Sequence, residues 1–160
     1  MTDSPDDPPL IPRPRTALDQ GRREPLEVRG SQRAPLRIAQ MGRRGRGVVA
    51  ERRIEPGELV ERSPVLVIPH ADRAAVDRTV VFTYVFMWEH GTVEEDLYKH
   101  EGRAAIALGF TSLLNHSHAP NCAFVRHIDD LVIDLVAARA IEAGEELTID
   151  YQMTLWFTPE

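Results

Sequence analysis

The sequence predicts one mainly β domain, over about residues 36–151, between a proline-rich arm and a short aromatic tail. Three observations predict it. Short runs of β-branched and aromatic residues recur along the body, turn-forming residues separate them, and few segments show a capped helical stripe. A length of 160 residues with 42% hydrophobic content suits a single soluble domain with a tail.

The arm, residues 1–35, holds seven of the twelve prolines and no aromatic residue. Such a segment buries too little apolar surface to offset its ordering entropy, so we expect it to be flexible. A partner contact at the Pro-Arg-Pro-Arg stretch, residues 12–15, is the alternative to a solvated leader. Residues 1–9 lack the apolar stretch of a secretory signal.

The body is predicted to begin with strands over residues 46–54 and 59–69. Between them, residues 55–58 read Glu-Pro-Gly-Glu and place Pro and Gly at the centre of a type II turn. Residues 80–88 are apolar and aromatic and predict a buried strand, although periodicity alone does not exclude a helix. Further strands are predicted over residues 104–108, 123–128, 131–138 and 147–151, with a hairpin turn at Asp129 and Asp130.

An internal repeat links two of these regions. Residues 50–58 and 137–145 are identical at six of nine positions, including an Ile and a Gly-Glu pair. We interpret the repeat as two equivalent hairpins that need the same turn chemistry.

Charge and cysteine content limit the function. The net charge is −6, but residues 37–53 carry +5 and residues 54–160 carry −11. An acidic body attracts cationic ligands and repels phosphates. A single cysteine, Cys122, excludes an internal disulfide and favours a reducing, cytoplasmic setting. The apolar runs are too short for a membrane span of about 20 residues.

Three segments carry side chains suited to chemistry. Five polar residues follow an apolar run closely: Asn115, His116, Ser117, His118 and Asn121. Polar groups near a core must be hydrogen-bonded, so both a structured loop and a binding site fit this segment. Tyr151 ends a late strand, where a core-edge role is the alternative to a functional one. Residues 45–47, Gly-Arg-Gly, allow a ligand to approach the backbone but lack the spacing of a dinucleotide fingerprint.

Taken in order, the segments Gly-Arg-Gly-Val-Val-Ala (45–50), Asn-His-Ser-His-Ala-Pro-Asn (115–121) and Gly-Glu-Glu-Leu-Thr-Ile-Asp-Tyr (144–151) resemble the SET domain family of protein-lysine methyltransferases. The resemblance covers about residues 36–151 and is closest to the short bacterial and viral forms. It implies a SET-domain fold of several small β-sheets with a C-terminal pseudoknot. The second and third segments would meet there.

The resemblance also implies S-adenosylmethionine-dependent methyl transfer to a lysine ε-amine of a protein, with cofactor and lysine entering from opposite faces. Tyr151 would stand at the transfer point. The cofactor-binding residues would be Gly45, Arg46, Gly47, Asn115, His116 and Trp156. Tyr84 and Phe110 would line the lysine channel, although core packing is the alternative for each ring.

The chemistry fits these roles. Methyl transfer from a sulfonium needs alignment of donor and amine, which can supply up to about 7–11 kcal/mol. The amine must be neutral, and an apolar channel beside a cationic sulfonium lowers its pKa from about 10.4. The Tyr151 hydroxyl can orient the amine and the polarised methyl through weak C–H···O contacts.

Two departures from the family pattern lead to further expectations. His118 stands where many relatives have a zinc-binding cysteine, and no cysteine follows Cys122, so we predict no structural zinc. A metal site made by His116, His118 and Cys122 is the disfavoured alternative, because it lacks a fourth ligand. Only residues 152–160 follow Tyr151 to close the cofactor cleft, so a homodimer is a hypothesis for completing it.

The predicted partner is a lysine-containing, basic protein, drawn to acidic clusters at residues 94–96, 129–130 and 145–146. A solvated acidic surface explains any one cluster equally well. Two other functions remain open. One is a non-catalytic module that binds a basic tail, and the other is a nucleic-acid-binding protein that uses the basic strip from Arg37 to Arg53.

Overall fold

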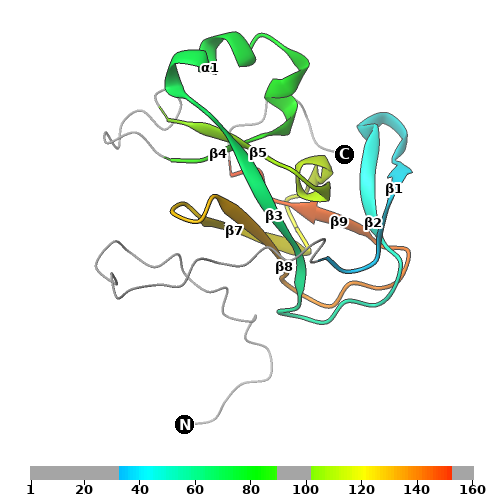
Figure 1. The fold of residues 1–160 in the computed structure, drawn as a ribbon. Coiled ribbons are helices and arrows are strands. Elements are labelled where there is room, and N and C mark those ends of the chain that lie inside the picture. Colours follow the sequence, from blue (N-terminus) through cyan, green and yellow to red (C-terminus); the bar gives the residue numbers. More distant parts are fainter. Residues whose placement is uncertain (1–32, 90–101, 153–160) are drawn as a thin grey trace, which may run out of the picture.

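The structure is a computed structural model, and it describes residues 33–89 and 102–152. Figure 1 shows a mainly β arrangement in which the long strand β3 (Leu59–Ile68) runs through the middle of the larger sheet. The smaller sheet lies beside it, toward the right of the view. The mainly β fold that the sequence predicts is confirmed.

The larger sheet has five antiparallel strands in the order β4-β5-β3-β8-β7. Besides β3 these are β4 (Val85–Met87), β5 (Ala104–Ala107), β7 (Cys122–His127) and β8 (Val132–Ala137). The first half of β3 pairs with β8 and its second half pairs with β5. One strand therefore joins two halves of the domain.

The smaller sheet has the order β1-β2-β9-β6. It contains β1 (Leu36–Gln40), β2 (Arg46–Ala50), β6 (Asn115–His116) and β9 (Glu146–Ile149). The pairs β1–β2 and β2–β9 are antiparallel, whereas β6 joins β9 in parallel. A short 3₁₀ turn, η1 (Gly42–Arg44), connects β1 to β2.

Three other helical segments complete the described fold. They are the α-helix α1 (His70–Val76) and the 3₁₀ turns η2 (Val80–Tyr84) and η4 (Phe110–Leu113). No helix among the described residues is long and apolar enough to cross a membrane.

The hydrophobic core takes residues from both sheets. Val48 and Leu147 of the smaller sheet join Ile133 and Leu135 of the larger one in a single cluster, and all four are fully buried. Burial of apolar surface at about 25 cal/mol per Å² is the main force holding the two sheets together. The strands that carry the candidate site are therefore anchored in the core on one face.

The prediction of a strand over residues 80–88 is wrong in its first half. Residues 80–84 form η2, and only Val85–Met87 is a strand. The Thr79 side chain accepts a hydrogen bond from the backbone N–H of Val81, which caps the 3₁₀ turn. Val80 is 72% exposed, so this end of the apolar run is not in the core.

The other predicted strands are confirmed within two residues at each end, except that the strand predicted over residues 46–54 ends at Ala50. The turn at residues 55–58 is also present, because Glu58 N–H bonds to the Glu55 carbonyl at 3.1 Å and Gly57 has a φ of 78°. A turn at residues 129–130 joins β7 and β8, as predicted.

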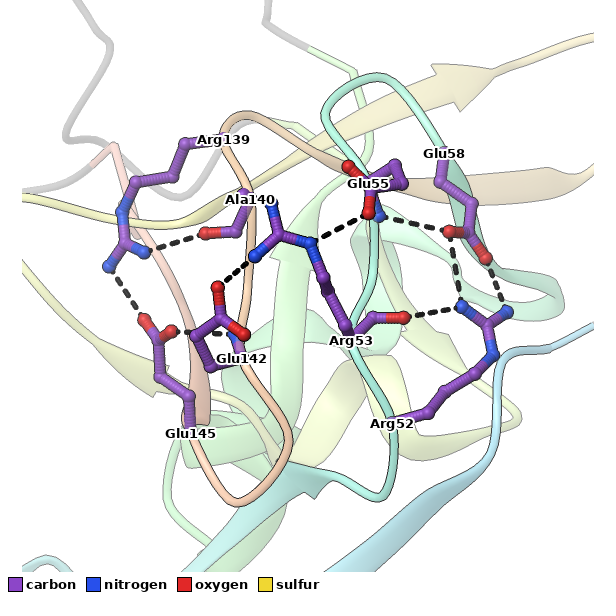
Figure 2. Close-up of polar contacts among 8 residues, drawn as sticks. All are labelled: Arg52, Arg53, Glu55, Glu58, Arg139, Ala140, Glu142 and Glu145. Atoms are coloured by element: carbon purple, nitrogen blue, oxygen red, sulfur yellow. Dashed lines mark hydrogen bonds and ion pairs between the residues drawn. The ribbon is translucent and has the colours of Figure 1, made fainter.

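The two repeated segments are not hairpins, and instead they pair with each other (Figure 2). Ile54 and Ile141 form an isolated antiparallel bridge through N–H···O bonds of 2.9 and 3.0 Å. Gly57 N–H bonds to the Ala137 carbonyl, and the equivalent Gly144 N–H bonds to the Ala50 carbonyl, both at 2.8 Å. The repeat thus encodes a local two-fold arrangement that connects the ends of β2 and β8.

Side chains of these loops follow the same symmetry. Arg52 pairs with Glu58, and the equivalent Arg139 pairs with Glu145 (Figure 2). Arg53 crosses between the loops to Glu142. The loops therefore hold each other by backbone bonds in the interior and by the Arg53–Glu142 ion pair at the surface.

Several expectations concern residues outside the described ranges. They are the flexible arm up to residue 32, the acidic cluster at residues 94–96 and the tail beyond Gln152. The described chain begins at Arg33, which forms a bridge with Glu61 of β3.

Candidate active site

The two segments that the sequence placed in the pseudoknot meet as adjacent parallel strands. Asn115 of β6 is in register with Thr148 of β9, and His116 with Ile149. The pairing continues beyond β6, because Ser117 N–H bonds to the Ile149 carbonyl at 3.0 Å. The expectation that these segments lie side by side is confirmed.

Tyr151 leaves the end of β9 and turns back toward β6. Its hydroxyl donates to the Leu114 carbonyl at 2.8 Å, and its backbone N–H donates to His116 Nδ1 at 3.2 Å. The Tyr151 and His116 rings contact edge to face, with centroids 5.3 Å apart. Two hydrogen bonds and a ring contact therefore fix the phenol against the Asn-His segment.

The proton on the phenol is held by its surroundings. Burial, with smaller contributions from Glu146 and Tyr84, raises the pKa of Tyr151. The hydroxyl is thus neutral at physiological pH and donates its hydrogen bond to the Leu114 carbonyl. No donor in residues 33–89 or 102–152 is bonded to its oxygen, which can accept from a neighbouring amine or polarised methyl.

His116 is buried in its neutral form. Burial lowers its pKa, and the nearby Asp150, at 3.8 Å, opposes this only in part. Because Nδ1 accepts from the Tyr151 N–H, the ring proton belongs on Nε2, which lies 3.4 Å from Nδ1 of His118. The His116 ring is therefore occupied by contacts with Tyr151 and His118.

The glycine-containing turn lies against the same strands. Gly45 has a φ of 76°, in the region that favours glycine. A Cβ on Gly47 would lie 2.5 Å from Glu146 Oε1 and 3.0 Å from Asn115 Nδ2. Only glycine therefore allows β2 to approach β6 and β9 this closely.

Asn115 joins the turn to β9. Its Nδ2 donates to the Arg46 carbonyl at 3.2 Å and to Glu146 Oε1 at 2.7 Å. The other Glu146 oxygen pairs with Arg44 at 2.6 Å. Through Asn115, the turn at Arg46 and the β9 carboxylate of Glu146 are thus connected, so the three segments meet here.

Of the other predicted residues, Tyr84 lies beside the site, Phe110 lies at the start of η4, and Trp156 is outside the described residues. The Tyr84 hydroxyl is 3.4 Å from the Arg46 guanidinium, and Tyr84 contributes to the raised pKa of Tyr151, so this ring borders the site. Phe110 starts η4, with the Arg33 guanidinium 4.3 Å from its ring centroid.

Three supporting residues were not predicted as part of the site. Glu146 is described above, and the sequence analysis treated it as a surface charge. Asn121 is fully buried, where its Nδ2 donates to the Glu146 carbonyl and its Oδ1 accepts from Thr148 N–H, both at 2.8 Å. Asn121 therefore holds β9 in place and belongs to the structured-loop interpretation.

Glu61 is the third supporting residue. It is buried in β3 and accepts hydrogen bonds from Thr111 N–H, Thr111 Oγ1 and Phe110 N–H at 2.7, 2.6 and 3.1 Å. These bonds hold η4, which leads directly into Leu114 and Asn115. Its sequence signal was a carboxylate in the middle of an apolar strand.

No group of three His, Cys, Asp or Glu side chains among the described residues is placed to hold a metal ion. Cys122 is buried in β7, and burial raises the pKa of its thiol to about 12. A neutral thiol is a poor metal ligand. The absence of structural zinc stays a prediction.

Comparison with known proteins agrees with this geometry. The SET domain model matches residues 45–152. A Schizosaccharomyces pombe histone-lysine N-methyltransferase, H3 lysine-37 specific, is 33% identical over 129 residues, which is 80% of each chain. The N-lysine methyltransferase KMT5A of Xenopus tropicalis is 35% identical over 117 residues, covering 68% of this chain and 33% of the relative.

Solved structures show the same fold. CpSET8 from Cryptosporidium has a TM-score of 0.58 and 20% identity, over 77% of this chain and 60% of the other. A chain of the Chaetomium thermophilum Polycomb repressive complex 2 has a TM-score of 0.59 and 23% identity, over 76% of this chain and 15% of the other. The chain therefore belongs to the SET domain family, and the protein is a protein-lysine methyltransferase.

Proposed function

We propose that this methyltransferase takes its methyl group from S-adenosylmethionine and transfers it to a lysine of a basic, histone-like protein. The observation that carries the proposal is the position of Tyr151, whose hydroxyl lies beside the Asn115–His116 segment and bonds to the Leu114 carbonyl at 2.8 Å. A histone is the substrate that the name of the Schizosaccharomyces pombe relative gives. The acidic character of residues 54–160 suits such a partner.

The residues present fit the cofactor's polar end. Gly45 is open to close approach, since nothing lies within 4 Å of the position its Cβ would take, and Asn115 offers its side-chain oxygen. Gly47 lets Asn115 and Glu146 pack against β2. We propose that these residues, with Arg46 and the His116 backbone, hold the cofactor. Trp156 is a further candidate from the sequence. When bound, the cofactor supplies a methyl group activated by a positive sulfur.

The chain's own contribution to the reaction is alignment. The lysine would first lose its proton to water, and its neutral nitrogen could then take the methyl group while the sulfur leaves with the bonding electrons as a neutral thioether. Tyr151 keeps its proton and presents lone pairs to the amine and to the methyl hydrogens. Tyr84 is proposed to line the lysine's approach, because its hydroxyl lies 3.4 Å from the Arg46 guanidinium.

The proposal is tested by calorimetry with S-adenosylmethionine and by transfer of labelled methyl to histone H3. We expect micromolar binding and label on lysine. Binding without label on any protein of a cell lysate would favour the non-catalytic module. Absence of binding would overturn the proposed cofactor.

The nucleic-acid alternative loses support from the basic strip itself. Three of its arginines are paired with carboxylates: Arg44 with Glu146, Arg52 with Glu58, and Arg53 with Glu55 and Glu142. Paired guanidiniums are less available to phosphates. A weak affinity for DNA that does not change between about 50 and 200 mM salt would exclude this function.

A homodimer that completes the cofactor cleft and a cytoplasmic location also remain proposals. Gel filtration of the full chain tests the homodimer, and a fully active monomer would exclude it.

Fractionation of the source cells tests the cytoplasmic location, and recovery of the protein in a membrane or secreted fraction would overturn it.

A further inference from the structure

The Glu146 carboxylate lies between two donors, a neutral amide and a guanidinium. One oxygen accepts from Asn115 Nδ2 at 2.7 Å, and the other pairs with the Arg44 guanidinium at 2.6 Å. The Glu146 side chain is 13% exposed, whereas that of Arg44 is 35% exposed. A carboxylate fixed by two partners is far less mobile than a free surface glutamate.

The contacts of Asn115 decide which way its amide faces. Both partners of the inner atom, the Arg46 carbonyl and Glu146 Oε1, are acceptors only. An amide oxygen in that position would face two other oxygens, so the NH₂ group must point there. Oδ1 therefore points away from both, and no donor from residues 33–89 or 102–152 reaches it.

Gly47 shows how closely this arrangement is packed. A Cβ at this position would approach Glu146 Oε1 to 2.5 Å and Asn115 Nδ2 to 3.0 Å. The carboxylate and the amide thus fill the space above the Gly47 backbone. The packing leaves Glu146 little room to release Asn115 while β2 and β9 stay paired.

We propose that Glu146, held by Arg44, is a positioning residue that fixes the orientation of the Asn115 amide. This inference rests on the proposed function, because the fixed Asn115 amide would act on the cofactor of that reaction. The Asn115 Oδ1, which points away from Glu146, would accept a hydrogen bond from a cationic nitrogen, the α-ammonium of the cofactor. Arg44 offsets the charge of Glu146, so the site recognises the ammonium through a directed hydrogen bond.

The role separates two kinds of ligand. A ligand with the α-ammonium gains from a preset Asn115, whereas a ligand in which hydrogen replaces the amino group does not. Without Glu146 the amide can rotate, and part of its orientation must be regained on binding. A loss limited to the first ligand would therefore identify positioning, whereas general damage to the fold would weaken both ligands.

The experiment measures binding of S-adenosylhomocysteine and of its des-amino analogue by calorimetry. The proteins are the wild type, Glu146→Ala, Glu146→Gln and the control Glu51→Ala, which removes an exposed carboxylate from the same sheet region. We expect Glu146→Ala to weaken S-adenosylhomocysteine roughly 10-fold and the analogue less than about 2-fold. Glu146→Gln, which keeps an acceptor for Asn115, should restore most of the affinity, and Glu51→Ala should behave as wild type.

A second measurement, hydrogen exchange of the Asn115 side-chain amide, needs no ligand. The Asn115 side-chain NH₂ signals, assigned by their loss in Asn115→Asp, should exchange slowly with solvent in the wild type and rapidly in Glu146→Ala. Equal weakening of both ligands, or unchanged binding with unchanged exchange, would overturn the inference. If the wild type binds neither ligand, the proposed function fails, and the exchange rates still decide whether Glu146 holds the amide.

Discussion

The Tyr151 hydroxyl donates a hydrogen bond to the carbonyl oxygen of Leu114, at 2.8 Å, although the two residues are 37 positions apart in the chain. The parallel pairing of β6 with β9 brings them together. The bond fixes the phenol in its neutral form, and none of the residues that the structure describes donates to its oxygen. A tyrosine that only filled the core edge would need a partner for its hydroxyl, but not one beside Asn115 and His116.

Removing this hydroxyl tests its part in methyl transfer. Tyr151→Phe keeps the ring contact with His116 and loses the bond to Leu114. We expect the rate of methyl transfer at saturating cofactor to fall roughly 10²-fold, the effect of losing one well-placed polar group. Affinity for S-adenosylmethionine should stay within about 2-fold of wild type. Full transfer by the variant would show that the hydroxyl has no catalytic part.

The stability of the protein should depend on the protonation of His116. Its pKa is lowered in the folded protein, whereas an unfolded histidine titrates near about 6.5. The unfolded chain therefore binds this proton first as pH falls, so stability is complete above that pH and declines below it. Protonation would also place an N–H on Nδ1 against the Tyr151 N–H.

Urea unfolding across this pH range measures the effect. His116→Asn removes the titrating group while leaving a short side chain that can accept a hydrogen bond. The slope of stability against pH should be smaller in this variant than in wild type. Identical slopes would mean that His116 is not the group responsible.

Cys122 should be unreactive in the folded protein. Burial raises its pKa to about 12, and the thiolate is the reactive form. A thiol reagent such as dithionitrobenzoate should label it only after unfolding in guanidinium chloride. Glu51→Cys, which adds an exposed thiol, is the positive control. Rapid labelling of the native wild-type chain would contradict the buried position.

The paired loops predict equal effects from two distant residues. Ile54 and Ile141 are both fully buried and bonded to each other. Replacing either with Ala should lower the free energy of unfolding by about 2–5 kcal/mol. Glu142→Ala, which removes the exposed ion pair with Arg53, should have a much smaller effect.

Urea unfolding of the three variants provides the comparison. Similar losses for Ile54→Ala and Ile141→Ala would support the two-fold pairing of the loops. If one of the two isoleucines could be replaced without loss of stability, the equivalence of the loops would be wrong.

Local patterns in the sequence were sufficient for much of the fold. The β-branched runs and the Pro-Gly turn before β3 depend on neighbouring residues, so strand positions could be predicted. The start of residues 80–88 could not, because the Thr79 side chain caps a 3₁₀ turn inside an apolar run. The repeat was visible, but its pairing across 87 positions depends on how β2 and β8 are placed by the sheets, as the Ile54–Ile141 bridge shows.

The site shows the same division. Motif residues at 45–47, 115–116 and 151 could be recognised in order, and the fold brings them together. Glu146 could not be recognised, because a carboxylate in a polar stretch has the same pattern whether it faces solvent or a buried donor. The sequence singled out Asn121 without separating a structural role from a binding role, and the carboxylate of Glu61 in an apolar strand did not indicate its partners. Their roles depend on partners such as Arg44 and Thr111 that only the three-dimensional structure identifies.

The most direct test of the central claim is a crystal structure of the full chain with S-adenosylhomocysteine. We predict the ligand against residues 45–47 and Asn115, with its sulfur facing the Tyr151 hydroxyl. A ligand bound elsewhere, with Tyr151 remote from its sulfur, would contradict the assignment of this site to methyl transfer.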